Sequence, residues 1–174
     1  MKKFCVIICL LSVGAASIFM ANLSYKEPPQ KVSYLRIHIR ANSNSTLDQN
    51  IKYQIKDHVV EYLTPKFLNC TSKTQALTIL KNNLSIIKSL ADKILSQNGF
   101  SYQSQPYINN EYFPTRSYNE LVLENGYYDA LIIKLGQGRG DNWWCVVYPP
   151  LCFVENSQNV EYKSKFLEII NKIF

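Results

Sequence analysis

Hydrophobic and polar positions follow regular patterns through the first half of the chain. Residues 33–40, SYLRIHIR, alternate with period two, which predicts a half-buried strand whose polar face, with His38, is solvated or hydrogen-bonded. Apolar residues recur every three to four positions over 45–63 and again over 72–98, and this spacing predicts two amphipathic helices. The first helix is expected to end before Pro65, because proline disfavours helical geometry at the preceding residue.

The second half of the chain is rich in aromatic and β-branched residues. An extended segment is expected over 100–114, followed by strands over 128–135 and 143–148 that pair as an antiparallel hairpin around the loop GQGRGDN. A last amphipathic helix is expected over 160–174. The order β-α-α-β-β-β-α predicts an α+β fold, with an antiparallel sheet of about four strands and two or three helices mainly on one face.

A hydrophobic leader precedes this predicted domain. Two lysines followed by a largely apolar stretch, residues 4–21, are typical of an export signal. Ala15-Ala16-Ser17 fits a cleavage site, and an uncleaved segment of this length could anchor the chain in a membrane. We expect a signal peptide or signal anchor over 1–21. A polar spacer over 22–32 and one domain over 33–174 are expected to follow it, both outside the cytoplasm.

Charge and histidine content exclude several function classes. The formal net charge is +6, but the basic residues are scattered, which does not favour nucleic-acid binding. The chain has only two histidines, His38 and His58, and no Cys-x-x-C motif, so a zinc site is not expected. We therefore expect neither a metal nor a cofactor.

Three glycines, Gly136, Gly138 and Gly140, form a G-x-G-x-G sequence that could suggest a phosphate-binding loop. Such a loop needs a helix N-terminus directly after the glycines, to supply free N–H groups. Here a predicted strand follows, and no Lys-Ser/Thr pair closes the motif. The sequence therefore favours a turn, and no small-molecule substrate is expected.

Cys145 and Cys152 lie on either side of a Pro-Pro step. In an exported domain these residues could form a disulfide or remain two buried thiols. A cysteine paired with His38 or His58 could also act as the nucleophile of a cell-envelope hydrolase. Cys145 lies inside an apolar strand, however, where a thiol is inert.

The neighbouring residues Trp143 and Trp144 must point to opposite faces of their strand. One of them is expected in the core, and the other is expected to cap the sheet edge or lie at the surface. Exposed aromatic and arginine side chains have the composition of a protein-binding hot spot. The predicted partner-binding residues are Arg116, Tyr118, Arg139, Asn142, Trp143 and Trp144.

Two blocks of the sequence carry specific motifs. The first, residues 35–63, contains the strand, the turn ANSNS and a helix beginning LDQNIK. The second, residues 113–153, contains PTR, the glycine loop, NWWC and PPLCF. Together these blocks resemble the stage II sporulation protein R family of endospore-forming Firmicutes. Asn44, where the family usually has Asp, and Arg40, where an aliphatic residue is common, depart from the pattern.

The resemblance implies a signalling protein rather than an enzyme. Members of this family are exported from the forespore into the space between the septal membranes. There they activate a membrane-embedded aspartic protease, which processes pro-sigma-E in the mother cell. The expected partner is thus this protease, with membrane contact through the N-terminal segment. A cysteine hydrolase and a non-catalytic wall-binding module are the alternatives.

Overall fold

The computed structural model describes residues 33–67, 69–118 and 121–153, and it confirms the α+β class. The predicted leader and the predicted helix over 160–174 lie outside these residues. The elements are β1 (Leu35–Arg40), α2 (Thr46–Phe67), α3 (Lys73–Gln97), β2 (Ser104–Phe113), β3 (Arg116–Tyr118), β4 (Leu121–Leu123), β5 (Gly126–Leu135), β6 (Asn142–Tyr148) and a 3-10 turn, η1 (Leu151–Phe153).

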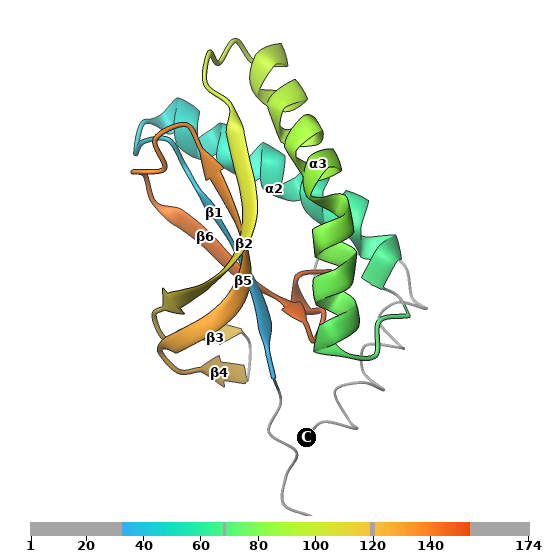
Figure 1. The fold of residues 1–174 in the computed structure, drawn as a ribbon. Coiled ribbons are helices and arrows are strands. Elements are labelled where there is room, and N and C mark those ends of the chain that lie inside the picture. Colours follow the sequence, from blue (N-terminus) through green and yellow to red (C-terminus); the bar gives the residue numbers. More distant parts are fainter. Residues whose placement is uncertain (1–32, 68, 119–120, 154–174) are drawn as a thin grey trace, which may run out of the picture. The chain divides into compact units, whose positions relative to one another are not determined.

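The main sheet has the strand order β2-β5-β1-β6 (Figure 1). Strand β1 pairs parallel to β5 and antiparallel to β6, so the sheet is mixed rather than entirely antiparallel. The predicted hairpin of β5 and β6 is therefore wrong, because β1 lies between these two strands. The connection between them crosses about 10 Å, which is two strand spacings and well within the reach of six residues.

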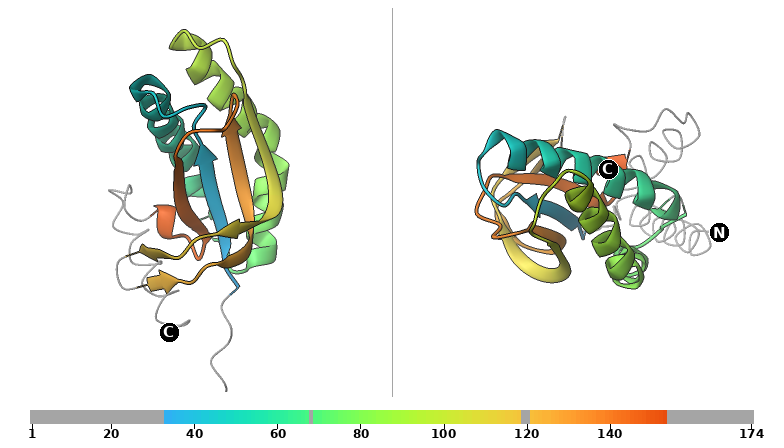
Figure 2. Two further views of the ribbon diagram at one scale, coloured as in Figure 1. Left: turned by 90° about the vertical axis from the view of Figure 1, so that its left-hand side faces the viewer. Right: turned by 90° about the horizontal axis from the view of Figure 1, so that it is seen from above.

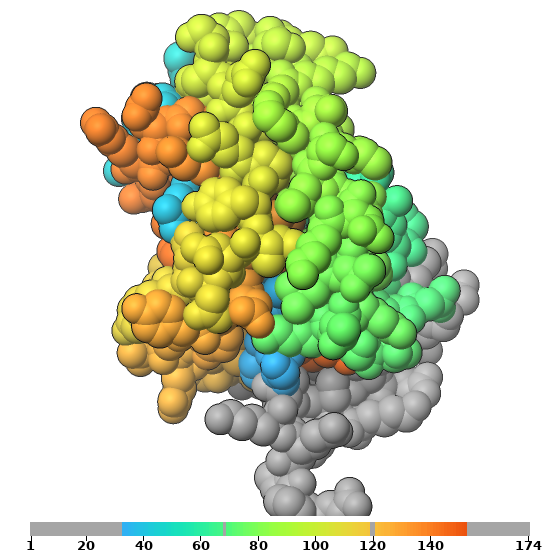
Figure 3. Space-filling model, in the orientation of Figure 1, coloured from blue at the N-terminus to red at the C-terminus, as the bar shows by residue number. Residues whose placement is uncertain are grey.

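The central position of β1 follows from its burial. Five of its six residues are buried, which requires cover on both faces of the sheet. Little of β1 reaches the surface in the view of Figure 3. The sequence predicts a solvated or hydrogen-bonded polar face for this strand. In the structure, Arg36 and His38 on that face are buried, at 0% and 1% exposure.

Helix α2 continues through Pro65 to Phe67, past the predicted end at Leu63. The last turn is held by the hydroxyl of Thr64, which donates to the carbonyl of Val60 at 2.7 Å, and by the buried side chain of Phe67. Near a helix C-terminus, this tertiary packing offsets the hydrogen bond that proline cannot donate.

Helices α2 and α3 cover one face of the sheet, as Figure 2 shows. Helix α3 begins with a capping box: Ser72 Oγ accepts from the N–H of Gln75 at 3.2 Å, and Gln75 Oε1 accepts from the N–H of Thr71 at 2.9 Å. The core between helices and sheet includes Ile37, Ile39, Ile51, Ile55, Val59, Leu80, Ile87, Ala91, Leu131, Ile133 and Val147.

The other face of the sheet carries a smaller cluster of Phe113, Ala130 and Ile132. A separate two-stranded sheet, β3 and β4, lies on this side near the start of β1 (Figure 2, left). Because this side has no helix in the described part of the chain, polar and aromatic side chains of the strands meet there directly.

Candidate functional site

The sheet face opposite the helices gathers arginine and aromatic residues from five strands, and we call it the basic–aromatic face. Strand alternation and register bring these side chains together, since paired residues such as His38 and Trp144 point to the same side. The face comprises Arg36, His38, Arg40, Glu111, Phe113, Arg116, Tyr118, Tyr128, Asn142 and Trp144.

Arg36 lies fully buried at the centre of this face. Its guanidinium carbon is 4.2 Å from the ring centroid of Phe113 and 4.8 Å from that of Tyr128. The Nη2 group donates to the hydroxyl oxygen of Tyr118 at 2.9 Å. The Nε and Nη1 groups have no hydrogen-bond partner among the described residues.

His38 is a neutral member of the face. Its ring lies 4.5 Å from that of Trp144 and 5.2 Å from that of Phe113. Burial, together with the positive charges of Arg40 and Arg36, lowers the pKa of His38 to about 3. Its Nε2 atom is 3.3 Å from a carboxylate oxygen of Glu111, a contact without hydrogen-bond geometry. Because the imidazole is uncharged at neutral pH, the ionic partner of Glu111 is Arg40.

Four of the six predicted partner-binding residues lie on this face. The Arg116 guanidinium carbon is 5.7 Å from the ring centroid of Trp144. Tyr118 accepts a hydrogen bond from the buried Arg36, and Asn142 pairs with Arg40 in the ladder. These four residues come from β3 and β6, which are distant in sequence.

The other two predicted residues lie elsewhere. Trp143 packs against the helix-side core, with the Nζ atom of Lys56 5.8 Å from its ring centroid. Arg139 is an exposed loop residue whose backbone N–H donates to the carbonyl of Asn42 at 3.2 Å. The two tryptophans therefore divide between the faces, as strand alternation predicts.

Sequence reasoning did not predict the remaining members of this face as partner-binding residues: Arg36, His38, Arg40, Glu111, Phe113 and Tyr128. The alternation of residues 33–40 did place Arg36 beside His38 and Arg40. The missing information was that aromatic residues of distant strands, among them Phe113, would cover this polar stripe.

The ANSNS turn and the following helix start are fixed by the buried carboxylate of Asp48. This carboxylate accepts from Asn42 Nδ2 at 3.0 Å, from the hydroxyl of Ser43 and from the hydroxyl of Tyr102. Burial raises the pKa of Asp48, but the hydrogen bonds from Ser43, Tyr102 and Asn42 outweigh it, and the net pKa is lowered. Burial and the neighbouring carboxylate raise the pKa of Tyr102. This cluster is an internal support of the turn.

The glycine loop packs directly on that turn. The N–H of Gly140 donates to the carbonyl of Ala41 at 2.9 Å, and the N–H of Asp141 donates to Asn44 Oδ1 at 2.6 Å. A Cβ atom on Gly140 would lie 2.2 Å from the carbonyl oxygen of Ser43. Glycine is therefore required for close backbone approach, and the loop joins the two sequence blocks rather than holding a phosphate.

Cys145 and Cys152 are buried free thiols in this structure, which corresponds to the second of the two alternatives that the sequence leaves open. Both sulfur atoms approach the carbonyl oxygen of Val146, at 3.9 Å and 2.7 Å respectively. Burial, reinforced by Cys145, raises the pKa of Cys152. Neither histidine is placed to activate these thiols: His38 lies on the opposite face of the sheet, and His58 is an exposed residue beside Glu61.

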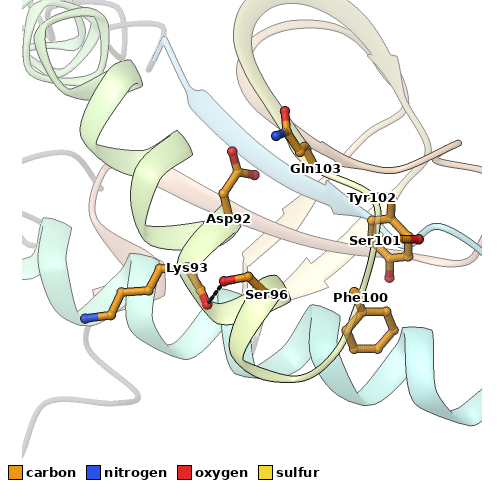
Figure 4. A pocket seen from close by; sticks show the side chains of 7 residues that line it. All are labelled: Asp92, Lys93, Ser96, Phe100, Ser101, Tyr102 and Gln103. Atoms are coloured by element: carbon orange, nitrogen blue, oxygen red, sulfur yellow. Dashed lines mark hydrogen bonds between the residues drawn. The ribbon is translucent and has the colours of Figure 1, made fainter.

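Pockets and metal-binding groups in the described part of the chain add no catalytic centre. One open pocket of about 480 Å³ lies between the last turns of α3 and residues 100–103 (Figure 4). Its carboxylate, Asp92, already accepts from the N–H and the hydroxyl of Ser104 at 2.6 Å and 2.7 Å. In the described ranges, no three His, Cys, Asp or Glu side chains are grouped to hold a metal. Across the same ranges, no helix has the length and apolar character to cross a membrane.

Comparison with known proteins identifies the family. The family described as Stage II sporulation protein R matches residues 31–158, which include both sequence blocks and the whole basic–aromatic face. The chain belongs to the stage II sporulation protein R family. It is 33% identical over 177 aligned positions to Stage II sporulation protein R of Bacillus subtilis (strain 168), covering 95% of this chain and 77% of that protein. No solved structure matches this sporulation protein.

Proposed function

We propose that this chain is an exported sporulation signal that activates a membrane-embedded aspartic protease across the septum. The activated protease then processes pro-sigma-E in the mother cell. Membership of the stage II sporulation protein R family supports the sporulation role. The finer role rests on what the basic–aromatic face is equipped to do.

The observation that carries the proposal is the composition of this face. Arg116 is exposed beside the half-buried Trp144, and Arg36 lies behind them with unused donors. Arginine and aromatic side chains that can lose water together are the residue types that dominate protein-binding hot spots. The face therefore has the chemistry of a docking surface for a protein partner.

The same residues argue against catalysis. His38 stays neutral well below pH 6, so it is a poor general base at neutral pH. The thiols of Cys145 and Cys152 are buried, and the raised pKa of Cys152 disfavours the thiolate that a nucleophile needs. A binding protein agrees with these environments better than a cysteine hydrolase does.

Export is part of the proposal. The lysines before the apolar segment 4–21 favour an N-terminus inside the cell, with the domain translocated. The domain would then lie in the space between the septal membranes, released or still anchored by its leader.

Co-expression of the full chain with the cognate protease and pro-sigma-E tests the proposal. We expect processed sigma factor only when all three are present. Absence of processing with a correctly exported chain would refute the activator role. Treatment of the exported chain with a thiol-alkylating reagent should leave processing unchanged, whereas a cysteine hydrolase would be inactivated. Binding to purified peptidoglycan without any processing would indicate a wall-binding module instead.

A further inference from the structure

The basic–aromatic face contains a buried positive charge that has no counter-ion among the residues that the structure describes. The face carries three positive charges, those of Arg36, Arg40 and Arg116, and one negative charge, that of the Glu111 carboxylate. That carboxylate is engaged by Arg40. No carboxylate of the described residues pairs with Arg36, which is 0% exposed.

This arrangement is unfavourable for an isolated protein. A guanidinium cannot lose its proton, so Arg36 stays charged. Removing a charge from water is costly unless it is paired and its N–H groups are hydrogen-bonded. Contacts with the rings of Phe113 and Tyr128 and one hydrogen bond to Tyr118 offset only part of this cost, since Nε and Nη1 remain unpartnered.

The chemistry that completes the site is that of a carboxylate. The guanidinium presents its donors in a planar fork, which a carboxylate matches with two parallel hydrogen bonds. A carboxylate is also flat, so it fits beside aromatic rings, and its single negative charge neutralises Arg36. Among the described residues, the acceptor that already contacts the fork is the hydroxyl of Tyr118, on the short strand β3.

The strand that carries Tyr118 lies outside the main sheet, where Tyr118 packs against the main core and Leu123 of β4 is buried. Strands β3 and β4 have three residues each and pair with each other rather than with the main sheet. A two-stranded sheet of this size has little stability of its own. An incoming acceptor can therefore replace the Tyr118 hydroxyl without disturbing the main sheet.

We propose that Arg36 is the receptor for an acidic side chain of the partner protein, whose carboxylate displaces the Tyr118 hydroxyl from Nη2 and binds Nη2 together with the adjacent, unused Nε group. This inference deepens the proposed function and rests on it for the identity of the partner. The carboxylate site itself can be measured without that partner.

The first experiment uses sodium acetate as the probe, with the full chain purified in a mild detergent. Thermal unfolding is measured in acetate and in sodium chloride of equal ionic strength. We expect acetate to raise the unfolding temperature by about 4 °C at ten times its dissociation constant. Sodium phosphate of the same ionic strength should give a smaller rise, and a larger rise would assign the site to free phosphate instead.

Three variants locate the effect. Arg36→Met should unfold in chloride at the same temperature as the wild type or higher, because an unpaired buried charge is replaced by an apolar chain, and it should lose the acetate effect. Arg36→Lys should keep only a reduced effect. Glu120→Gln, which removes the carboxylate between β3 and β4 in the sequence, should keep it fully. An unfolded or strongly destabilised Arg36→Met, or an acetate effect that persists in it, overturns the proposal. Loss of the effect in Glu120→Gln does so as well.

The processing assay separates this inference from the proposed function. With a functional wild-type chain, Arg36→Met should lose processing while remaining folded. Normal processing by this variant would refute the assignment to the partner and leave the activator role intact. If the wild type gives no processing, the activator role fails, whereas the acetate measurement still decides whether Arg36 binds carboxylates.

Discussion

Replacing Asp48 by asparagine should remove the support that joins the first sequence block to the glycine loop. The carboxylate of Asp48 is 6% exposed and accepts hydrogen bonds from Asn42, Ser43 and Tyr102. Asn42 in turn accepts from the backbone N–H of Gln137 at 2.9 Å. The substitution keeps the shape of the side chain but turns one acceptor atom into a donor.

The magnitude follows from the donors that lose their partner. A hydrogen bond to a charged acceptor contributes about 1.5–3 kcal/mol, and an amide nitrogen facing Asn42 or Ser43 leaves at least one donor unpaired. We therefore expect Asp48→Asn to lower the free energy of unfolding by about 2–4 kcal/mol. Asp57→Asn is the matched control on the same helix, because the Asp57 side chain is 59% exposed. It should cost less than about 0.5 kcal/mol.

Denaturant unfolding at several pH values is the assay. The lowered pKa of Asp48 means that its carboxylate stabilises the fold above its unfolded pKa of about 4. This stabilisation is lost as the pH falls through the folded pKa. The wild type should therefore lose stability on acidification below about pH 4 more steeply than Asp48→Asn does. Equal losses of stability for Asp48→Asn and Asp57→Asn at neutral pH would refute this role.

Three further predictions concern other parts of the domain. The lowered pKa of His38 makes the wild type lose stability as the pH falls from about 6.5 to about 3, by at most about 1.4 kcal/mol per pH unit. His38→Phe should remove this pH dependence of the free energy of unfolding. Denaturant unfolding across this pH range measures the dependence, and an unchanged slope in the variant contradicts the prediction. Gly140→Ala should cost about 1–3 kcal/mol through its clash with the Ser43 carbonyl, whereas Gly126→Ala, which meets only Tyr128 at 3.8 Å, should cost much less; equal costs would contradict the close approach. The buried thiols should resist alkylation in the native protein and react once it is unfolded, as mass spectrometry would show; rapid modification of the folded chain would mean that they are accessible.

Local structure was predictable because its causes are local. The capping box at Ser72 and Gln75 and the alternation of residues 33–40 appear in the sequence and in the structure. Helix α2 extends past Pro65 because the burial of Phe67 in the core overrides a local preference. The sequence does not show that burial.

The pairing of the strands and the burial of the polar face of β1 were not predictable in the same way. The loop after β5 looked like a hairpin turn, but the buried strand β1 takes the central place between β5 and β6. The stripe of Arg36 and His38 looked solvated because the short strands β3 and β4 have no clear hydrophobic pattern. Four of the predicted partner-binding residues still met on one face, since strand alternation fixes the side to which each residue points.

The most direct test of the account is a matched charge reversal in the processing assay. Arg116→Glu changes an exposed arginine on the basic–aromatic face, and Lys81→Glu makes the same kind of change on the exposed surface of α3. If this face binds the protease, Arg116→Glu should reduce processing of pro-sigma-E at least ~10-fold, while Lys81→Glu should retain it. Equal processing by both variants, exported to the same level, would contradict the assignment of this face to the partner.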